Sequence, residues 1–204
     1  MSEGGQASKQ VTLASKSAAR AQLLAGAGVS FETMGSGVDE DAAKARLLSD
    51  DADPRDIALA LAETKALVVS TRRPGLIIGA DQTLDLDGSL FDKVATLDEA
   101  RHRLERLRGR EHQLHSGVAV ARDGAVIWRE TRGATLGMRD FSDGFLAGYL
   151  ARNGEAALSS VGCYQLEGEG LQLFDRIEGD YFTILGLPML GLLALLRREG
   201  VIAA

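Results

Sequence analysis

The sequence predicts an α/β fold in which a mixed sheet is flanked by helices. Short apolar runs of strand length alternate with longer segments in which apolar residues recur at helical spacing. Two Asp-Gly pairs, at 87–88 and 123–124, lie between apolar segments and are typical of tight hairpin turns. Because such hairpins join antiparallel neighbours, a mixed sheet fits this chain better than a purely parallel one.

The first third of the chain predicts two short strands and two helices. Residues 11–14 form an apolar run, and Ser17 is placed to cap the helical segment that follows. Residues 29–33 have the composition of a second short strand. Asp53-Pro54 is a typical helix start, and the residues that then recur at helical spacing are Ile57, Leu61, Lys65 and Val68.

The rest of the chain continues this alternation. Residues 76–80 predict a fully apolar strand that ends at Asp81, and residues 114–121 and 125–130 predict a strand pair around the second Asp-Gly turn. Thr96 and Glu99 have the spacing of a capping box, which marks the start of a helix. Further helices are expected over 142–152 and from Pro188 to near Gly200.

Size and composition predict one globular domain over residues 1–204. Apolar residues make up 45% of the chain and charged residues 25%, which is ordinary for a globular protein. No repeat, low-complexity block or linker divides the sequence. Residues 1–9 are polar and are expected to form a flexible tail in front of the domain.

Charge and cysteine content predict a cytoplasmic protein without nucleic-acid or membrane partners. The net charge of −6 argues against a broad basic face for nucleic acid. The longest apolar stretch, residues 187–196, is about half of the roughly 20 residues that cross a bilayer. Cys163 is the only cysteine, and the N-terminus lacks the apolar core of a signal peptide, so a reducing interior is expected.

The segment after the first predicted strand has the residues of an anion site. Backbone N–H groups at a helix start favour an anion, and Ser15 and Ser17 add hydroxyl donors. Arg20, one turn into the helix, can bind two phosphate oxygens at once. The alternative is an ordinary capped helix with a solvated arginine.

Asp81 is the strongest single candidate for a catalytic or metal-binding residue. A carboxylate at the end of an apolar strand lies where ligand sites of open sheets form. Such a group can hold Mg²⁺ or take a proton from an attacking water. The alternative is a turn aspartate bound by local amides, although Gln82 and Thr83 add polar groups beside it.

Other charged residues are ambiguous when they are taken one at a time. Glu40 lies in an acidic run that could complete a metal site with Asp81, although such runs are usually solvated surface. Lys65 falls on an apolar helical stripe, where it either extends to solvent or serves a buried site. The role of Lys93 is equally ambiguous when that residue is taken alone. The familiar patterns GxxxxGK[ST], HExxH, CxxC, GxSxG and GxGxxG are absent, and His102, His112 and His115 are expected to be structural or surface residues.

Taken together, these clusters resemble the Maf-like nucleoside triphosphate pyrophosphatases, a family named for a link to septum formation. The resemblance runs nearly end to end, and its strength lies in the order and spacing of the motifs. The matching segments are ASKSAAR (14–20), VDE (38–40), LAETKA (61–66), IGADQ (78–82), DK (92–93), GREHQLHSGVAV (109–120), GCYQLEGEG (162–170) and IEGDYFTILGLP (177–188).

The resemblance implies an elongated fold with a strongly bent mixed sheet and two lobes around a central cleft. It implies hydrolysis of nucleoside triphosphates to the monophosphate and diphosphate with a divalent cation (Mg²⁺, Mn²⁺ or Co²⁺), and a possible homodimer. Carried over by motif, Asp81 is the general base, and Glu40 joins it in metal binding. The residues that the resemblance places on the triphosphate are Ser15, Ser17, Arg20, Lys65 and Lys93.

Departures from the family pattern bear on the preferred base. Ala18 and Ala19 stand where the family usually has proline and arginine, and Val94 stands where proline is usual. Members that prefer uridine or thymidine triphosphates typically have threonine and glutamine where this chain has Gln82 and Glu167, so the chain is closer to the 7-methyl-GTP type. A carboxylate at Glu167 can accept both N–H donors of guanine and favours a base made cationic by methylation.

The favoured hypothesis is therefore a pyrophosphatase that clears modified or non-standard nucleoside triphosphates. A second hypothesis is a nucleotide-binding regulator of cell division with little catalysis, to which the missing arginine at Ala19 lends some support. A third is a phosphomonoesterase, which would release orthophosphate instead of diphosphate.

Overall fold

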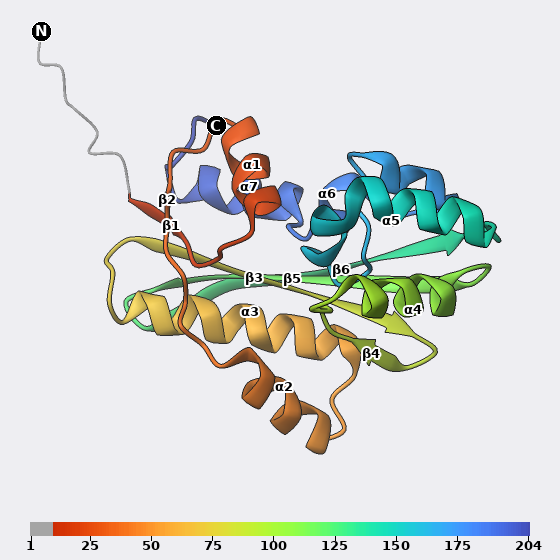
Figure 1. The fold of residues 1–204 in the computed structure, drawn as a ribbon. Coiled ribbons are helices and arrows are strands. Elements are labelled where there is room, and N and C mark those ends of the chain that lie inside the picture. Colours follow the sequence, from red (N-terminus) through yellow and green to blue (C-terminus); the bar gives the residue numbers. More distant parts are fainter. Residues whose placement is uncertain (1–9) are drawn as a thin grey trace, which may run out of the picture.

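A computed structural model describes residues 10–204, and the tail predicted for residues 1–9 lies outside the described residues. The described part of the chain forms a seven-stranded mixed sheet with helices on both faces (Figure 1). The predicted α/β fold with a mixed sheet is confirmed. Among residues 10–204, no helix is long and apolar enough to cross a membrane.

The sheet combines parallel and antiparallel pairing. Its strand order is β2-β1-β3-β5-β6-β7, and β4 pairs with β3 off this path. β1 runs parallel to β2 and β3, whereas the other neighbours are antiparallel. The strands are β1 (Val11–Leu13), β2 (Glu32–Thr33), β3 (Leu76–Leu86), β4 (Ser89–Phe91), β5 (Glu111–Arg122), β6 (Ala125–Met138) and β7 (Phe174–Glu178).

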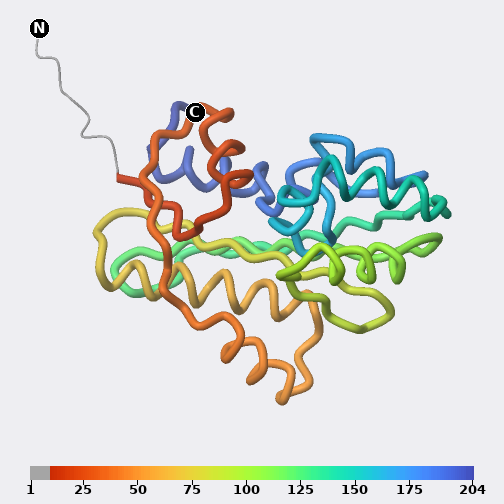
Figure 2. Tube along the Cα trace, viewed as in Figure 1, coloured from red at the N-terminus to blue at the C-terminus, as the bar shows by residue number. Residues whose placement is uncertain are grey.

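Helices cover the two faces unequally. Figure 1 shows α2 and α3 under one face and α1, α5, α6 and α7 over the other. The helices are α1 (Ala18–Gly26), α2 (Glu40–Ser49), α3 (Pro54–Ser70), α4 (Leu97–Leu107), α5 (Asp143–Leu158), α6 (Tyr181–Ile184) and α7 (Met189–Arg198), with a 3₁₀ helix η1 (Glu169–Leu173). Figure 2 shows that α2 lies at the margin of the molecule, while the chain at both its ends returns to the body.

The predicted caps and turns are present. Ser17 and Asp53 each accept a backbone N–H at the start of α1 and α3, and the capping box at the start of α4 is complete. Ser142, which was not predicted as a cap, does the same at the start of α5. Both hairpin turns have positive φ at their aspartate, 52° in each case, followed by a glycine at 80° or 78°. Positive φ at both central residues is the requirement of a type I′ turn, which Asp-Gly satisfies.

The prediction that Asp81 ends a strand was wrong. β3 continues to Leu86, and Asp81 pairs with Gly117 in the middle of the strand. The continuation is mostly polar, with Leu84 and Leu86 as its apolar residues, but it keeps its pairing with β5, so the strand outlasts its apolar run. The predicted strand over 29–33 shortens to β2, because the N–H of Val29 returns to the carbonyl of Leu24 and closes the end of α1.

Two glycines let α3 lie directly on the sheet. A β-carbon at Gly79 would stand 2.1 Å from the carbonyl oxygen of Ala62, and one at Gly117 would stand 2.5 Å from that of Ala58. The backbones of α3, β3 and β5 are therefore in contact, with only small side chains between them. This close approach brings Lys65, on the same helix, to the side chain of Asp81.

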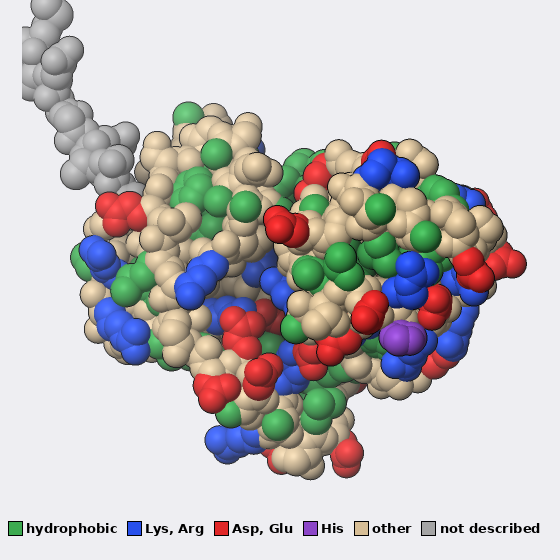
Figure 3. Space-filling model, viewed as in Figure 1, with side chains coloured by type: hydrophobic (Ala, Val, Ile, Leu, Met, Phe, Trp, Pro, Cys, Tyr) green, Lys and Arg blue, Asp and Glu red, His purple; other side chains and the backbone are tan. Residues whose placement is uncertain are grey.

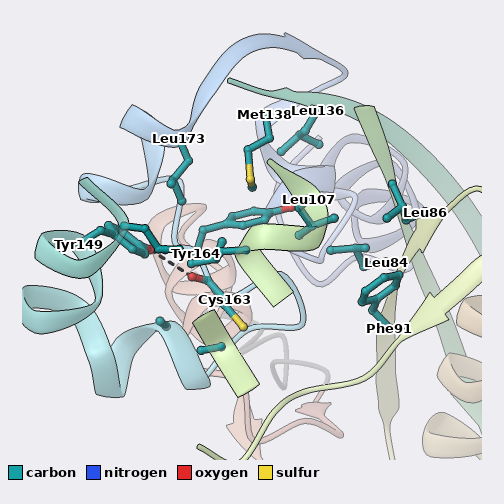
Figure 4. Packing of buried hydrophobic residues seen from close by; sticks show 14 of the residues in the cluster. Leu84, Leu86, Phe91, Leu107, Leu136, Met138, Tyr149, Cys163, Tyr164 and Leu173 are labelled. Carbon is teal, nitrogen blue, oxygen red and sulfur yellow. Dashed lines mark hydrogen bonds between the residues drawn. The ribbon is translucent and has the colours of Figure 1, made fainter. Parts of the chain in front are cut away.

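The opposite face of the sheet carries two hydrophobic cores. The first includes Leu13, Leu24, Ile78, Val118 and Leu192, and the second includes Leu84, Leu107, Leu136, Tyr149 and Tyr164. Figure 4 shows the second core, in which the Tyr149 hydroxyl donates to the carbonyl of Cys163.

A polar layer separates the two cores along β3 and β5. The Gln82 amide donates to Ser116 Oγ (2.9 Å) and to the carbonyl of Thr183 (3.1 Å), and Ser116 Oγ donates to that same carbonyl (2.7 Å). Gln82 and Ser116 face each other across the two strands. The molecule is therefore divided into a first and a second lobe, named after the cores, that meet at this layer.

Candidate active site

The sheet leaves a gap on one edge of β3, and Asp81 lies in its middle. β1 pairs with β3 as far as Ile78, and β4 pairs with it from Leu84 onward. Within residues 10–204, no strand pairs with positions 79–83 on that edge. Six residue steps of a strand span roughly 20 Å, so the ends of β1 and β4 flank an opening at Asp81.

A buried ion pair lies at this gap. Lys65 Nζ donates to Asp81 Oδ1 at 2.6 Å and lies 2.9 Å from Glu40 Oε1. Lys65 is 5% exposed and Asp81 is 7% exposed, whereas Glu40 is at the surface. Burying such a pair gains little stability, because the desolvation of both charges offsets their attraction. A buried pair beside an opening is instead typical of a functional site.

Glu40 reaches the pair from the first residue of α2. Asp39 caps that helix by accepting the N–H of Ala42 at 3.0 Å, so the two neighbouring acids have different tasks. The cap fixes where α2 begins, and Glu40 then extends toward Lys65. The acidic run is thus not simply solvated surface.

Arg20 joins three distant segments beside the pair. Its Nη1 donates to the carbonyl of Ala80 (3.0 Å) and to Ser15 Oγ (3.2 Å), and its Nε donates to the carbonyl of Gly186 (2.8 Å). Burial lowers the pKa of Arg20, and the charges of Asp81 and Glu40 partly oppose that shift. The sequence pointed to Arg20 as a phosphate ligand but missed this anchoring of the backbone.

Lys93 lies in the same electrostatic neighbourhood, just beyond β4. Desolvation lowers its pKa first, and the charges of Arg20 and Lys65 lower it further, while Glu40 and Asp81 raise it. The charges of all four other candidates therefore influence the pKa of Lys93. Figure 3 shows acidic and basic side chains gathered in a hollow between the two lobes. The cations at 20, 65 and 93 and the acids at 40 and 81 therefore form one charged cluster, which we call the charged cleft.

The two serines form the turn that leads into α1. Ser15 is buried, and its Oγ accepts the N–H of Ser17 at 3.2 Å; Ser17 Oγ in turn accepts the N–H of Arg20 at 3.4 Å. In these bonds both hydroxyl oxygens are acceptors, so the hydroxyl protons are not used by them. The turn therefore presents donors next to Arg20.

The three residues predicted to set the base preference do not lie together, unlike the charged residues of the cleft. Gln82 points to the sheet face opposite Asp81, where its amide binds Ser116 and the backbone of α6. Glu167 is exposed in the turn before η1, and within the described chain no hydrogen bond or ion pair joins it to the charged cleft. Ala19 lies half-buried in the first turn of α1.

The two carboxylates of the cleft, Asp81 and Glu40, suit a metal ion that binds together with a phosphate-bearing substrate. Among residues 10–204, no group of three His, Cys, Asp or Glu side chains could hold a metal by itself. Asp81 and Glu40 nevertheless both reach the ammonium of Lys65, so their oxygens point to a common region. Mg²⁺ is commonly bound by one or two carboxylates together with substrate phosphates and waters, and this pair of acids suits that arrangement.

The three histidines are not part of the charged cleft. His112 is 2% exposed, its Nε2 lies 2.7 Å from the Tyr164 hydroxyl, and burial lowers its pKa to about 4. His102 is exposed, and His115 lies beside Asp85. A cavity of about 300 Å³ near this end of β3 is lined by Asp85, Asp87, Gly88, Glu111, His112, Gln113 and Thr135, and it contains none of the five charged cleft residues.

Fold and cleft together define an α/β protein with a cluster of basic and acidic side chains at a gap in its sheet. The chain belongs to the Maf-like protein family, whose sequence model matches residues 10–199. The serine turn, Glu40, the Lys65–Asp81 pair and Lys93 all fall inside that match.

Named relatives cover almost the whole chain. The chain is 65% identical to a protein of Caulobacter vibrioides named nucleoside triphosphate pyrophosphatase. The match extends over 192 residues, which are 94% of this chain and 96% of the relative. It is 50% identical over 191 residues to the 7-methyl-GTP pyrophosphatase of Brucella abortus, with 93% and 96% covered. It is also 50% identical over 195 residues to the 7-methyl-GTP pyrophosphatase of Mesorhizobium japonicum, with 95% and 98% covered.

Proposed function

We propose that this protein is a metal-dependent nucleoside triphosphate pyrophosphatase, which hydrolyses its substrate to the monophosphate and diphosphate and so clears modified or non-standard nucleotides. The observation that carries the proposal is the buried Lys65–Asp81 pair at the gap in β3, with Glu40, Arg20 and Lys93 around it. Membership of the Maf-like family and the names of the relatives support it.

The cations of the cleft suit a triphosphate. A nucleoside triphosphate carries several negative charges, and attack at phosphorus adds charge to the oxygens around it. Arg20, Lys65 and Lys93 come from α1, α3 and the segment after β4, so they would approach a bound triphosphate from different sides. Positive groups held in place before the reaction stabilise that developing charge without having to reorganise.

Asp81 is proposed as the general base. Its Oδ1 accepts from Lys65, which orients the carboxylate and leaves Oδ2 to take a proton from a water in the cleft. Asp81 and Glu40 are also proposed to hold the divalent cation, Mg²⁺, Mn²⁺ or Co²⁺. When bound, that cation supplies Lewis-acid polarisation of a phosphate oxygen and neutralises part of its charge.

The setting is proposed to be the cytoplasm. Cys163 is buried and free, as expected for a protein of a reducing compartment. A homodimer and an absence of nucleic-acid partners remain predictions, the latter from the net charge of −6.

Product analysis tests the proposed reaction. The purified protein is incubated with Mg²⁺, Mn²⁺ or Co²⁺ and a panel of canonical, deaminated and methylated nucleoside triphosphates. The proposal expects equal amounts of diphosphate and nucleoside monophosphate. Release of orthophosphate would instead indicate a phosphomonoesterase, and tight binding without any product would indicate a nucleotide-binding regulator.

A further inference from the structure

Helix α2 carries Glu40 but has little packing to hold it in place. None of its side chains is buried, whereas α3 buries eight side chains, from Ile57 to Ser70. Most of the stability of a helix in a protein comes from packing one apolar face. Apart from its contact with α3, the position of α2 must therefore depend on polar contacts.

Two side chains on one face of α2 make such contacts. Glu40 and Lys44 are four residues apart, which places them on the same side of the helix. Glu40 pairs with Lys65, and Lys44 donates to the carboxylate of Asp92. The Lys44 side chain is only 18% exposed, so it lies against the protein along most of its length.

Asp92 belongs to a segment that is anchored on the second lobe. Arg103 of α4 donates to the Asp92 carbonyl at 2.7 Å and stacks on the ring of Phe91, 4.5 Å from its centre. Lys93 follows directly in the chain. The Lys44–Asp92 ion pair thus connects α2 to the segment that presents Lys93.

We propose that Lys44 and Asp92 are positioning residues, whose ion pair holds the start of α2 at the edge of the cleft so that Glu40 and Lys93 face the same bound nucleotide. The inference rests on the proposed function. Among the described residues, no other hydrogen bond or ion pair joins α2 to the segment that carries Asp92 and Lys93. Neither residue touches the reacting atoms.

The pair is expected to affect function more than stability. An ion pair with one solvent-exposed partner contributes little to folding. A rise of about 2- to 5-fold in the concentration needed for half-maximal activity corresponds to about 0.4–1 kcal/mol, which lies within the range of such pairs. Because Glu40 is a proposed metal ligand, the metal concentration required by the enzyme should rise, which a purely structural ion pair would not cause.

Charge exchange tests the pair in the full chain. Lys44→Glu and Asp92→Lys are made singly and together, and activity is measured against Mg²⁺ and against nucleotide. Each single variant should raise the Mg²⁺ midpoint and the KM about 2- to 5-fold, and the double variant should return close to the wild-type values. Unchanged single variants, or a double variant as impaired as the worse single variant, would overturn the proposal.

A second ion pair provides the matched control. Arg108 of the second lobe lies 2.7 Å from Asp143 and links the end of α4 to the start of α5, away from α2. Arg108→Met should leave the Mg²⁺ midpoint unchanged. A rise equal to that of Lys44→Glu would mean that any loss of an ion pair has this effect, and the positioning role would be rejected.

Hydrogen exchange separates this inference from the proposed reaction. In Lys44→Glu, the amides of α2 should exchange faster than in the wild type, those of α3 should not change, and the double variant should restore protection. If the wild-type protein releases no diphosphate, the proposed function fails while exchange still decides whether the pair holds α2. Unchanged exchange in α2 would refute the holding role whatever the activity.

Discussion

Arg20 and Gly186, 166 residues apart in the chain, meet at 2.8 Å through the Arg20 Nε donor and the Gly186 carbonyl oxygen. The same guanidinium binds the carbonyl of Ala80, the residue before Asp81. The first and last motifs of the chain are therefore tied together next to the proposed base. This contact explains why both ends of the sequence take part in one site.

Replacing Arg20 with lysine should impair both stability and turnover. Lysine keeps the charge but cannot bind Gly186 and Ala80 at once, because it lacks the planar fork of arginine. Loss of these bonds should lower the free energy of unfolding by about 2 kcal/mol and kcat/KM by at least about tenfold. Denaturant unfolding and steady-state kinetics measure the two effects. Arg197→Lys, at an exposed position on α7, is the control, and an equal response there would contradict the anchoring role.

Gly79→Ala should be severely destabilising. Its β-carbon would lie 2.1 Å from the Ala62 carbonyl oxygen and 2.6 Å from the Ala66 nitrogen, so α3 would have to move off the sheet. We expect a loss of more than about 3 kcal/mol in the free energy of unfolding, or failure to fold. Gly26→Ala is the control, since nothing lies within 4 Å of its β-carbon. A stable Gly79→Ala protein with normal packing would disprove the direct contact of α3 with β3.

His112 should make the protein lose stability in mild acid. Burial lowers its pKa from 6.5 to about 4, so the folded state holds it neutral. Between these values the unfolded chain binds a proton that the folded chain does not, and stability therefore rises with pH over this range. The contribution is complete above pH 6.5 and amounts to about 3 kcal/mol at most.

The test compares unfolding free energies of the wild type and His112→Asn between pH 4 and 7. The variant should show a clearly smaller rise with pH, whatever its absolute stability, and His102→Asn at an exposed position is the control. Equal pH slopes for the wild type and His112→Asn would show that this buried ring is not responsible.

Glu167→Gln tests the base preference. If the Glu167 carboxylate accepts the two N–H donors of guanine, the variant should lose about 10-fold or more of any preference for 7-methyl-GTP over UTP, measured as the ratio of kcat/KM values. Glu155→Gln, at an exposed position on α5, provides the control. An unchanged ratio would remove Glu167 from base recognition.

Helix starts and hairpin turns were the parts of the fold that the sequence predicted best, because they depend on residues close together in the chain. Ser17, Asp53 and the Thr96–Glu99 box define helix starts through bonds to their near neighbours, so a few residues suffice to recognise them. The Asp-Gly turns are equally local, because the required positive φ depends on those two residues.

Helix α2 escaped prediction for a physical reason. It buries no side chain, so it has no apolar stripe that the sequence could reveal. Asp81 was misplaced at a strand end because the apolar run stops there, while the pairing of β3 with β5 continues through Asp85. Convergence of the five charged groups depends on strand register and on the approach of α3 at Gly79, and neither is encoded in any one motif.

The most direct measurement is the turnover of Asp81→Asn. The substitution keeps the size of the side chain and removes its ability to accept a proton, so diphosphate release should fall at least about 1,000-fold. The protein should still fold, because Glu40 also pairs with Lys65, although loss of one charge from the buried pair should lower the melting temperature. Asp175→Asn, at an exposed position on β7, should behave as wild type. Near-normal diphosphate release by Asp81→Asn would contradict the account.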